Sequence, residues 1–286
     1  MAGIPQIGFV AYASQPAWVG ETIESGLERL AQQIGKGKYG SWAENEIAGR
    51  FLADPILERI EGAKCLVADI SSLNFNVTYE VGYAIAKGKR VVLVRNRAHA
   101  ADELARADLR RVGIFDTLGF REYENGDEFA AILRNIKDFD GLPVPTIVDT
   151  TTPVWMLQFP FNTEVQGRLV ARLKKARLRF RSFDPSEQAR LAANDAIESV
   201  ANAYGVVIPL ATKDMVDARI HNLRAAFSAG LSHGLAKSTL LLQSGDDPVP
   251  LDYRDLVQHF RHAKQIDEYV AQLALDVHEG EQHHER

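Results

Sequence analysis

Two kinds of segment alternate along this chain: short apolar runs, and longer stretches with the 3.6-residue periodicity of an amphipathic helix. In the first half the apolar runs are Ile7–Tyr12, Cys65–Asp69 and Arg90–Val94, and the helical stretches are Trp18–Ile34, Asp54–Gly62, Val77–Lys87 and about Asp127–Phe139. Strands that alternate with helices form a parallel sheet with helices on both faces. The pattern therefore predicts an α/β fold of the Rossmann-like or flavodoxin-like type.

The same alternation occurs a second time. The segment "DGLPVPTIVDTTTP" (140–153) breaks the periodicity with three prolines and a threonine run, and we interpret it as a linker. A new strand pattern, "VWMLQFPF", then begins at 154, and later segments repeat the order of elements found in the first half. We therefore predict an internal duplication: a first domain at 1–145, a second copy at 153–262, and a C-terminal helix or tail at 263–286. The last nine residues, "HEGEQHHER" (278–286), are expected to form a disordered tail.

The two copies can be aligned by their landmarks. "RAAFSAGLSHGLAKSTLLL" (224–242) repeats "NVTYEVGYAIAKGKRVVLV" (76–94), so that Gly82 aligns with Gly230 and Glu80 aligns with Ser228. The strand-end Asp69 aligns with Leu210, and the second copy has about seven extra residues between this strand and the following helix. Lys89 aligns with Lys237, and late in each half Asp108 of "DLRR" aligns with Asp252 of "DYRD". The second copy thus keeps the apolar frame and lacks the acids, so we expect it to retain the fold without the chemistry.

Composition limits the classes of protein to consider. The chain has 286 residues, of which 46% are hydrophobic and 25% charged, as in globular proteins. A net charge of −5 argues against a nucleic-acid partner. Cys65 is the single cysteine and suits a reducing compartment, and no apolar run reaches the roughly 18 residues of a membrane span. We expect a cytoplasmic protein that has no contact with a membrane.

The clearest candidate for chemistry is Glu80. In a parallel α/β sheet, ligands bind at the carboxyl ends of the strands, where Asp69 and the loop Ser71–Asn76 are expected to lie. Glu80 would stand in the first turn of the following helix and face the same crevice. A carboxylate near a helix N-terminus is also stabilised by the helix dipole, by roughly 0.3–1 kcal/mol, so a purely structural role for Glu80 stays open at this point.

The stretch "YEVGYA" with the following "GK" and strand resembles the signature of the nucleoside 2-deoxyribosyltransferase-like superfamily, whose architecture is related to that of TIR domains. The resemblance implies that Glu80 is the nucleophile at the sugar C1′, that Asp54 matches an acid in the preceding helix, and that Tyr12 orients the nucleophile. The family carries a further acid six residues before the nucleophile, where this chain has Asn74. That departure leaves transfer, hydrolysis and binding without turnover as alternatives.

This resemblance implies cleavage or transfer at an N-glycosidic bond in a nucleoside, a nucleotide or NAD. Glu80 would stabilise or trap the cationic sugar, and Asp54 or Asp69 would protonate the departing base. Neither role needs a metal or a cofactor. The residues expected to contact the substrate are Tyr12, Ser71, Asn74, Asn76, Tyr79 and Gly82.

Other functions stay open. Tandem domains with one degenerate copy can act as a nucleotide-sensing module or as an assembly platform without catalysis. At the level of fold alone, related domains recur in antiviral, anti-phage defence systems in bacteria. Pockets in this superfamily are often completed by a neighbouring subunit. The second copy can close the pocket within one chain or pair with another chain. Because its helix stays apolar while the acids are lost, we predict a homo-oligomer in which Val77–Ala86 or Ala225–Leu235 contributes to the interface.

Overall fold

The computed structural model describes residues 6–44, 54–100, 103–137 and 140–284. The first half contains β1 Gly8–Ala11, α1 Ala17–Ile34, β2 Tyr39–Ser41, η1 Trp42–Glu44, α2 Asp54–Gly62, β3 Cys65–Asp69, α3 Phe75–Ala86, β4 Arg90–Asn96, α4 Arg97–Ala100, α5 Glu103–Val112, η2 Phe115–Thr117, β5 Phe120–Tyr123 and α6 Gly126–Arg134. The second half contains β6 Val154–Leu157, α7 Glu164–Lys175, β7 Phe180–Phe183, α8 Ala193–Ala201, β8 Gly205–Leu210, α9 Ala218–Gly234, β9 Ser238–Ser244, η3 Leu251–Leu256, β10 Val257–Phe260 and α10 Ala263–His284.

Each half forms one five-stranded sheet in which every strand is parallel to its neighbours. The strand order is β2-β1-β3-β4-β5 in the first sheet and β7-β6-β8-β9-β10 in the second. When the strands of each half are numbered from its own start, both orders read 2-1-3-4-5, which is the order of flavodoxin-like sheets. The predicted α/β fold in two tandem halves is therefore confirmed.

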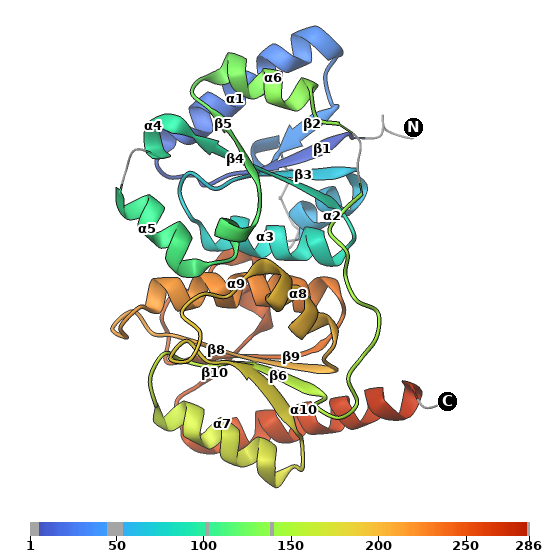
Figure 1. Cartoon of the computed structure of the whole chain (residues 1–286), viewed down its shortest axis with the longest axis vertical. Coiled ribbons are helices and arrows are strands. Elements are labelled where there is room, and N and C mark those ends of the chain that lie inside the picture. The colour runs from blue at the N-terminus through green and yellow to red at the C-terminus, as the bar shows by residue number, and fades with distance from the viewer. Residues whose placement is uncertain (1–5, 45–53, 101–102, 138–139, 285–286) are drawn as a thin grey trace.

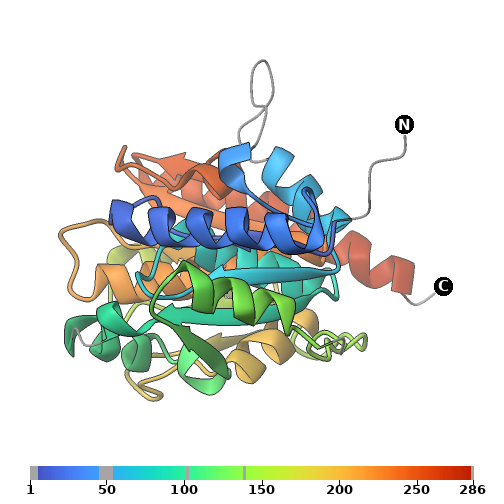
Figure 2. The same ribbon diagram turned by 90° about the horizontal axis from the view of Figure 1, so that it is seen from above.

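Layers of helices alternate with the two sheets (Figure 1). Helices α1 and α6 cover the outer face of the first sheet and lie side by side when the molecule is seen from above (Figure 2). Helices α7 and α10 cover the outer face of the second sheet. Between the two sheets lie α2 and α3 from the first half and α8 and α9 from the second. Because one apolar cluster runs through these inner layers, the two halves share a core.

The inner layer is organised around the crossing of α3 and α9, where two glycines allow the helices to touch. A Cβ atom added to Gly82 would lie 2.3 Å from the carbonyl oxygen of Phe227, and one added to Gly230 would lie 2.0 Å from that of Tyr79. Phe227 and Tyr79 are themselves an aligned pair, so the two contacts are equivalent across an internal pseudo-twofold axis. Both glycines are thus required by helix packing, since any side chain would displace backbone.

The predicted interface between subunits is used within the chain instead. The residues of α3 from Val77 to Ile85 are all buried, and α9 is buried along most of its length against α3. The second copy therefore packs on the first within one chain, which was one of the two expected arrangements. The oligomeric state itself stays a prediction, as no partner chain bears on it.

The C-terminal segment differs from expectation, and the segment between the two halves agrees with it. The nine residues from His278 onward were expected to form a disordered tail, but helix α10 continues to His284, and its apolar side chains, including Ile266 and Val277, pack on the second sheet. The segment 140–153 has no helix or strand, as predicted for a linker. Among the described helices, none is long and apolar enough to cross a membrane.

Candidate active site between the two halves

A cavity of about 390 Å³ opens at the carboxyl end of the first sheet. It lies beside the ends of β1 and β3, where the strand order reverses and where open α/β sheets bind ligands. Its described lining residues come from both halves of the chain: Tyr12, Ser14, Trp42, Ala43, Ile56, Asn74, Asn76, Val77, Glu80, Leu251 and Asp252. Four residues proposed from the sequence, namely Tyr12, Asn74, Asn76 and Glu80, are therefore brought together.

The start of α3 places Glu80 in this cavity. Asn74 is the N-cap of α3, and its Oδ1 accepts hydrogen bonds from the backbone N–H groups of Asn76 at 2.8 Å and Val77 at 3.3 Å. Asparagine is among the residues best suited to this position, which fixes the direction in which the helix begins. Glu80 lies in the second turn of α3 and not in the first turn as predicted, because the helix begins at Phe75, two residues before the predicted start. Its side chain is only 5% exposed.

The second half contributes a carboxyl group directly beside Glu80. Asp252, in η3, is also only 5% exposed, and its carboxyl group lies within hydrogen-bonding reach of that of Glu80. Burial raises the pKa of Glu80 well above its ordinary value, and the charge of Asp252 raises it further. Burial also raises the pKa of Asp252, to about 6. Two buried carboxyl groups in contact cannot both ionise at low cost, so the pair carries one shared proton near neutral pH.

Three buried oxygen atoms on the wall of this cavity accept no hydrogen bond from a described residue. They are Oε2 of Glu80, Oδ2 of Asp252 and Oδ1 of Asn76. A proton shared by the two carboxyl groups would form one hydrogen bond between them. The amide oxygen of Asn76 needs a donor from elsewhere, since a buried acceptor without a partner costs about 1–3 kcal/mol. A ligand with N–H or O–H groups would supply that donor.

Aromatic side chains form the opposite wall. The rings of Tyr12 and Trp42 lie 5.5 Å apart, and Trp42 is 39% exposed. The hydroxyl of Tyr12 donates a hydrogen bond to Glu24 at 2.5 Å, and Ser41 donates to the same carboxylate at 2.7 Å. Glu24 thus holds Tyr12 in place from α1, and the exposed indole of Trp42 offers a flat surface on which a planar ring can stack.

Two of the proposed residues at the end of β3 lie outside this cavity. Asp69 is fully buried and accepts hydrogen bonds from the N–H of Ser71 at 3.0 Å, from its hydroxyl at 2.9 Å and from the hydroxyl of Tyr123 at 2.7 Å. The hydroxyl of Ser71 accepts in turn from the N–H of Asn96. This network ties the ends of β3, β4 and β5 together. Burial raises the pKa of Asp69 to about 6.

The remaining proposed residues also face elsewhere. Asp54 begins α2 and is exposed, and it is not among the residues that line the cavity. Tyr79 lies one position before Glu80 and therefore points about 100° away around the helix; its hydroxyl contacts His233 of the second half. Gly82 lies at the crossing with α9. Of the acids proposed beside Glu80, neither Asp54 nor Asp69 reaches the cavity, and the carboxyl group that does is that of Asp252.

Sequence patterns hold only partial signals for Asp252 and Trp42, which were not proposed as site residues. Asp252 was aligned with Asp108 as a repeat landmark, but nothing in the alignment indicates that η3 of one half reaches the cavity of the other. Trp42 follows the stretch "GKGKYG" (35–40), whose glycines and lysines predict a loop and whose last residues form part of β2. The lysines of that stretch lie at the amino end of β2, at the edge of the sheet opposite the cavity.

Comparisons with known proteins do not add to this picture. No family model matches the chain, and no curated protein is significantly similar to it in sequence. Among the described residues, no group of three or more His, Cys, Asp or Glu side chains is arranged to hold a metal ion. The chain is an α/β protein of two tandem parallel-sheet halves, and arguments about its function depend on its own residues.

Proposed function

We propose that the protein cleaves or transfers the N-glycosidic bond of a nucleoside, with Glu80 as the nucleophile and Asp252 as its acid partner. The observation that carries the proposal is the buried Glu80–Asp252 pair on the wall of a cavity at the carboxyl end of a parallel sheet. The resemblance of "YEVGYA" to the nucleoside 2-deoxyribosyltransferase-like superfamily supports the same chemistry from the sequence.

One proton in the pair suits this reaction. At rest the shared proton lies on Glu80, because burial and the charge of Asp252 raise the pKa of Glu80 well above its ordinary value. For the reaction this proton moves to Asp252 across the contact between the two carboxyl groups, which leaves the charge on Glu80. The C1′–N bond then breaks, its electron pair stays on the base nitrogen, and the proton of Asp252 passes to the base. A carboxylate oxygen of Glu80 then bonds to C1′ or stabilises the cationic sugar. Water, or the nitrogen of a second base, then bonds to C1′ and gives a proton to Asp252; where Glu80 has bonded to C1′, that bond breaks and its electron pair returns to the Glu80 carboxylate. The products are a free base and either a sugar or a new nucleoside.

The cavity favours an uncharged nucleoside over a nucleotide or NAD. Its described lining residues include two carboxyl groups and no lysine or arginine, so a phosphate group would lack a counter-charge there. The tyrosine and tryptophan rings suit a base, and Oδ1 of Asn76 suits a donor from a sugar hydroxyl or from the base edge.

The test is incubation of the purified protein with nucleosides, 2′-deoxynucleosides, the matching monophosphates and NAD, followed by chromatography of the released base. We expect release from one or more nucleosides, and a loss of roughly 10³-fold or more in Glu80→Gln. Ser228→Ala, at the aligned position of the second half, is the matched control and should keep full activity. Saturable nucleoside binding without base release would instead support a sensing module.

A further inference from the structure

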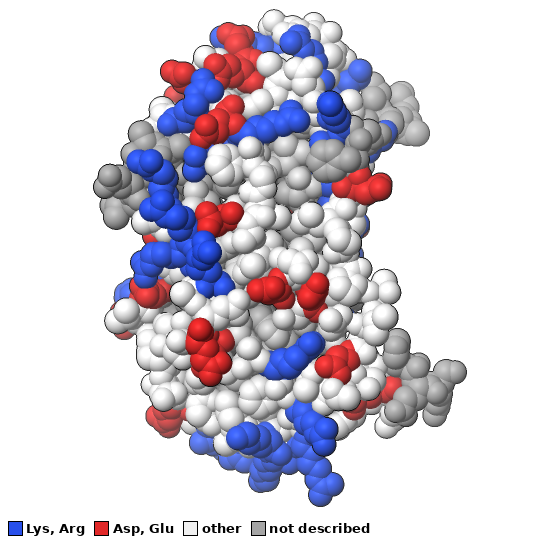
Figure 3. Space-filling model, viewed as in Figure 1, with Lys and Arg blue, Asp and Glu red and all other residues white. Residues whose placement is uncertain are grey.

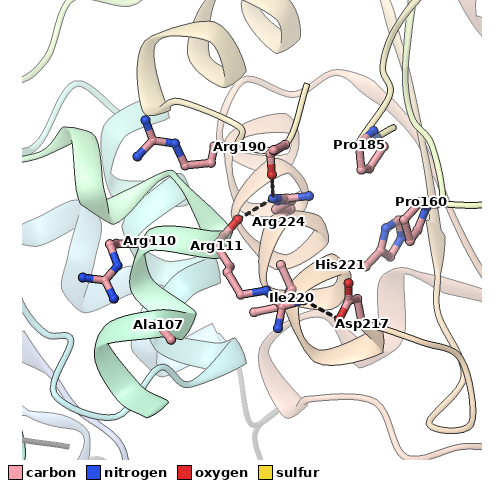
Figure 4. Close-up of a pocket in the computed structure, with 11 residues that line it drawn as sticks. Ala107, Arg110, Arg111, Pro160, Pro185, Arg190, Asp217, Ile220, His221 and Arg224 are labelled. Atoms are coloured by element: carbon pink, nitrogen blue, oxygen red, sulfur yellow. Dashed lines mark hydrogen bonds and ion pairs between the residues drawn. The ribbon is translucent and has the colours of Figure 1, made fainter. Parts of the chain in front are cut away.

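A second cavity, of about 510 Å³, lies at the position of the second half that is equivalent to the Glu80 cavity. Its residues follow the carboxyl ends of β6 and β7, border α9 and reach across to α5 of the first half (Figure 4). The residues that line it are Ala107, Arg110, Arg111, Pro160, Pro185, Ala189, Arg190, Asp217, Ile220, His221 and Arg224. Each cavity is therefore built mainly by one half and completed by the other.

The charge of this cavity is opposite to that of the first. Four arginines and one carboxylate line it. Arg111 pairs with Asp217 at 2.5 Å, and Arg190 pairs with Asp116, outside the lining, at 2.6 Å. Arg110 is exposed and makes no ion pair with a described residue. Figure 3 shows a cluster of basic side chains over α5 and the adjoining edge of the second half.

Arg224 is the most unusual of the four, because it is a buried cation. It is only 4% exposed, and its guanidinium donates to the carbonyl oxygens of Val112 at 3.1 Å, Arg111 at 2.5 Å and Ala189 at 2.7 Å. Figure 4 shows the bond to Arg111. No described carboxylate contacts it. Burial, and then the charge of Arg111, lower the pKa of Arg224 to about 10. A buried cation whose partners are neutral carbonyl groups would be stabilised by an anion in the adjoining cavity.

A second polar group on the wall lacks a partner. His221 is 2% exposed, and its Nε2 lies 2.7 Å from the carbonyl oxygen of Pro209, so Nε2 carries the proton and donates. Its Nδ1 is then a buried acceptor, and no described residue donates to it. The imidazole stays neutral, since burial lowers the pKa of His221 to about 4. Phe159 stacks beside it with ring centres 4.8 Å apart.

We propose that this cavity is a second binding site, for a small organic phosphate, with the phosphate held by Arg110 and Arg190 above the buried charge of Arg224. The organic part lies over Pro160 and Ile220 and donates a hydrogen bond to Nδ1 of His221. The concave shape and the volume suit a small molecule. This site does not depend on the proposed chemistry at Glu80 and would be present even if that chemistry failed.

The test is calorimetric titration of the full chain with ADP, pyrophosphate and adenosine at low salt and at 0.5 M salt. We expect ADP to bind more tightly than either pyrophosphate or adenosine, with an affinity that falls as salt rises. Arg110→Gln and Arg190→Gln should each weaken ADP binding by about tenfold or more, because each removes a charge-assisted contact. Both side chains are exposed, so these variants should fold.

Arg179→Gln is the matched control: Arg179 is exposed and precedes β7, at the edge of the sheet opposite the cavity. It should leave ADP affinity within about twofold of the wild-type value, as should Glu80→Gln. The proposal is overturned if ADP does not bind at millimolar concentration, or if Arg110→Gln and Arg190→Gln bind it as tightly as Arg179→Gln does. Equal affinities for ADP and pyrophosphate would exclude the role given to His221.

Discussion

The two halves of this protein have the same strand order and place a cavity at the same point, yet the two cavities differ in charge. In the first, Asn76 and Glu80 of α3 face Asp252 of the second half. In the second, the position aligned with Asn76 holds Arg224, the position aligned with Glu80 holds Ser228, and the other half contributes arginines from α5. The shared topology thus fixes where a ligand can bind, and a few side chains on α3, α9, α5 and η3 set the charge of the ligand.

The comparison also shows that neither cavity belongs to one half alone. The apolar cluster between the sheets is continuous, and each cavity is completed across it. The domain boundary at 140–153 therefore separates two sheets but does not separate two sites. Because each cavity is shared, a residue of the second half should control the chemistry proposed for the first half. Mutation of that residue is the most sensitive test of the pseudo-symmetric arrangement.

The largest effect is expected at Asp252. Asp252→Asn keeps the size of the side chain and removes the proton donor, so base release should fall by roughly 10²–10⁴-fold, as for loss of a general acid. The measurement is the rate of base release with a nucleoside that the wild-type protein cleaves. Asp108→Asn is the control, because Asp108 is the aligned residue of the first half and pairs with Arg219 instead of Glu80. Equal rates for the two variants would remove Asp252 from the mechanism.

Features of the site that depend on neighbouring residues in the chain were predicted better than contacts between the two halves. Local patterns gave α2 and β3 with their observed bounds. They began the Glu80 helix at Val77, whereas α3 begins at Phe75, so Asn74 is its N-cap instead of a loop residue and Glu80 lies in its second turn. Contacts between the halves have no local signature, so Asp252 was aligned as a landmark but given no role. Asp69 resembled a site residue because it ends a strand, but its hydrogen bonds to Ser71 and Tyr123 use it within the sheet.

The elements that the sequence did not predict are mostly short strands at the sheet edges. β2, β5 and β10 have three or four residues each, and β5 and β10 expose most or half of their side chains, so they lack a continuous apolar run. The duplication itself was predicted because its landmarks are glycines and lysines at fixed spacing. The aligned glycines of α3 and α9 prove to be packing residues, which accounts for their presence in both copies.

The next effect in size concerns this helix crossing. Gly230→Ala places a Cβ atom 2.0 Å from the carbonyl oxygen of Tyr79, so the backbones must separate, and we expect a loss of about 3 kcal/mol or more in the free energy of unfolding. Gly167→Ala in α7 is the control, since nothing lies within 4 Å of its added Cβ atom. It should stabilise the protein by about 0.5–1 kcal/mol. Denaturant unfolding measures both, and a tolerated Gly230→Ala would contradict the close crossing.

A smaller effect is expected in the dependence of stability on pH. The pKa of Asp252 is about 6 in the folded protein, against an ordinary value of 3.8. Between these two values the unfolded chain has lost the proton and the folded protein keeps it, so stability falls as pH rises from about 4 to about 6. Asp252 contributes up to about 3 kcal/mol to this fall in the free energy of unfolding, because each pKa unit corresponds to about 1.4 kcal/mol.

Asp69 contributes in the same window, because burial raises its pKa to about 6 as well. Glu80 contributes in the same direction, because burial and the charge of Asp252 raise its pKa well above the ordinary value. Asp252→Asn should therefore reduce the fall in stability without abolishing it, and Asp108→Asn should leave it unchanged. Thermal unfolding at pH 4, 5, 6 and 7 measures the slope. If the wild-type protein gains stability over this range, then Asp252 and Asp69 do not keep their protons in the folded protein.

The smallest effect separates the two roles of Asn74, which caps α3 and lines the cavity. Asn74→Ala should cost about 1 kcal/mol of stability, as for other lost caps. Asn125→Ala removes the equivalent cap of α6, where Oδ1 accepts from the backbone N–H of Glu128, and should cost a similar amount while leaving base release unchanged.

Asn74→Asp keeps the cap and adds a charge near the helix N-terminus, so its stability should stay within about 0.5 kcal/mol of the wild-type value or rise. If the amide of Asn74 serves only as a cap, Asn74→Asp should release base at a rate within tenfold of the wild-type rate. A larger change, in either direction, would show that the charge at this position helps to set the proton distribution of the Glu80–Asp252 pair, and that the asparagine here tunes the chemistry of the cavity as well as its shape.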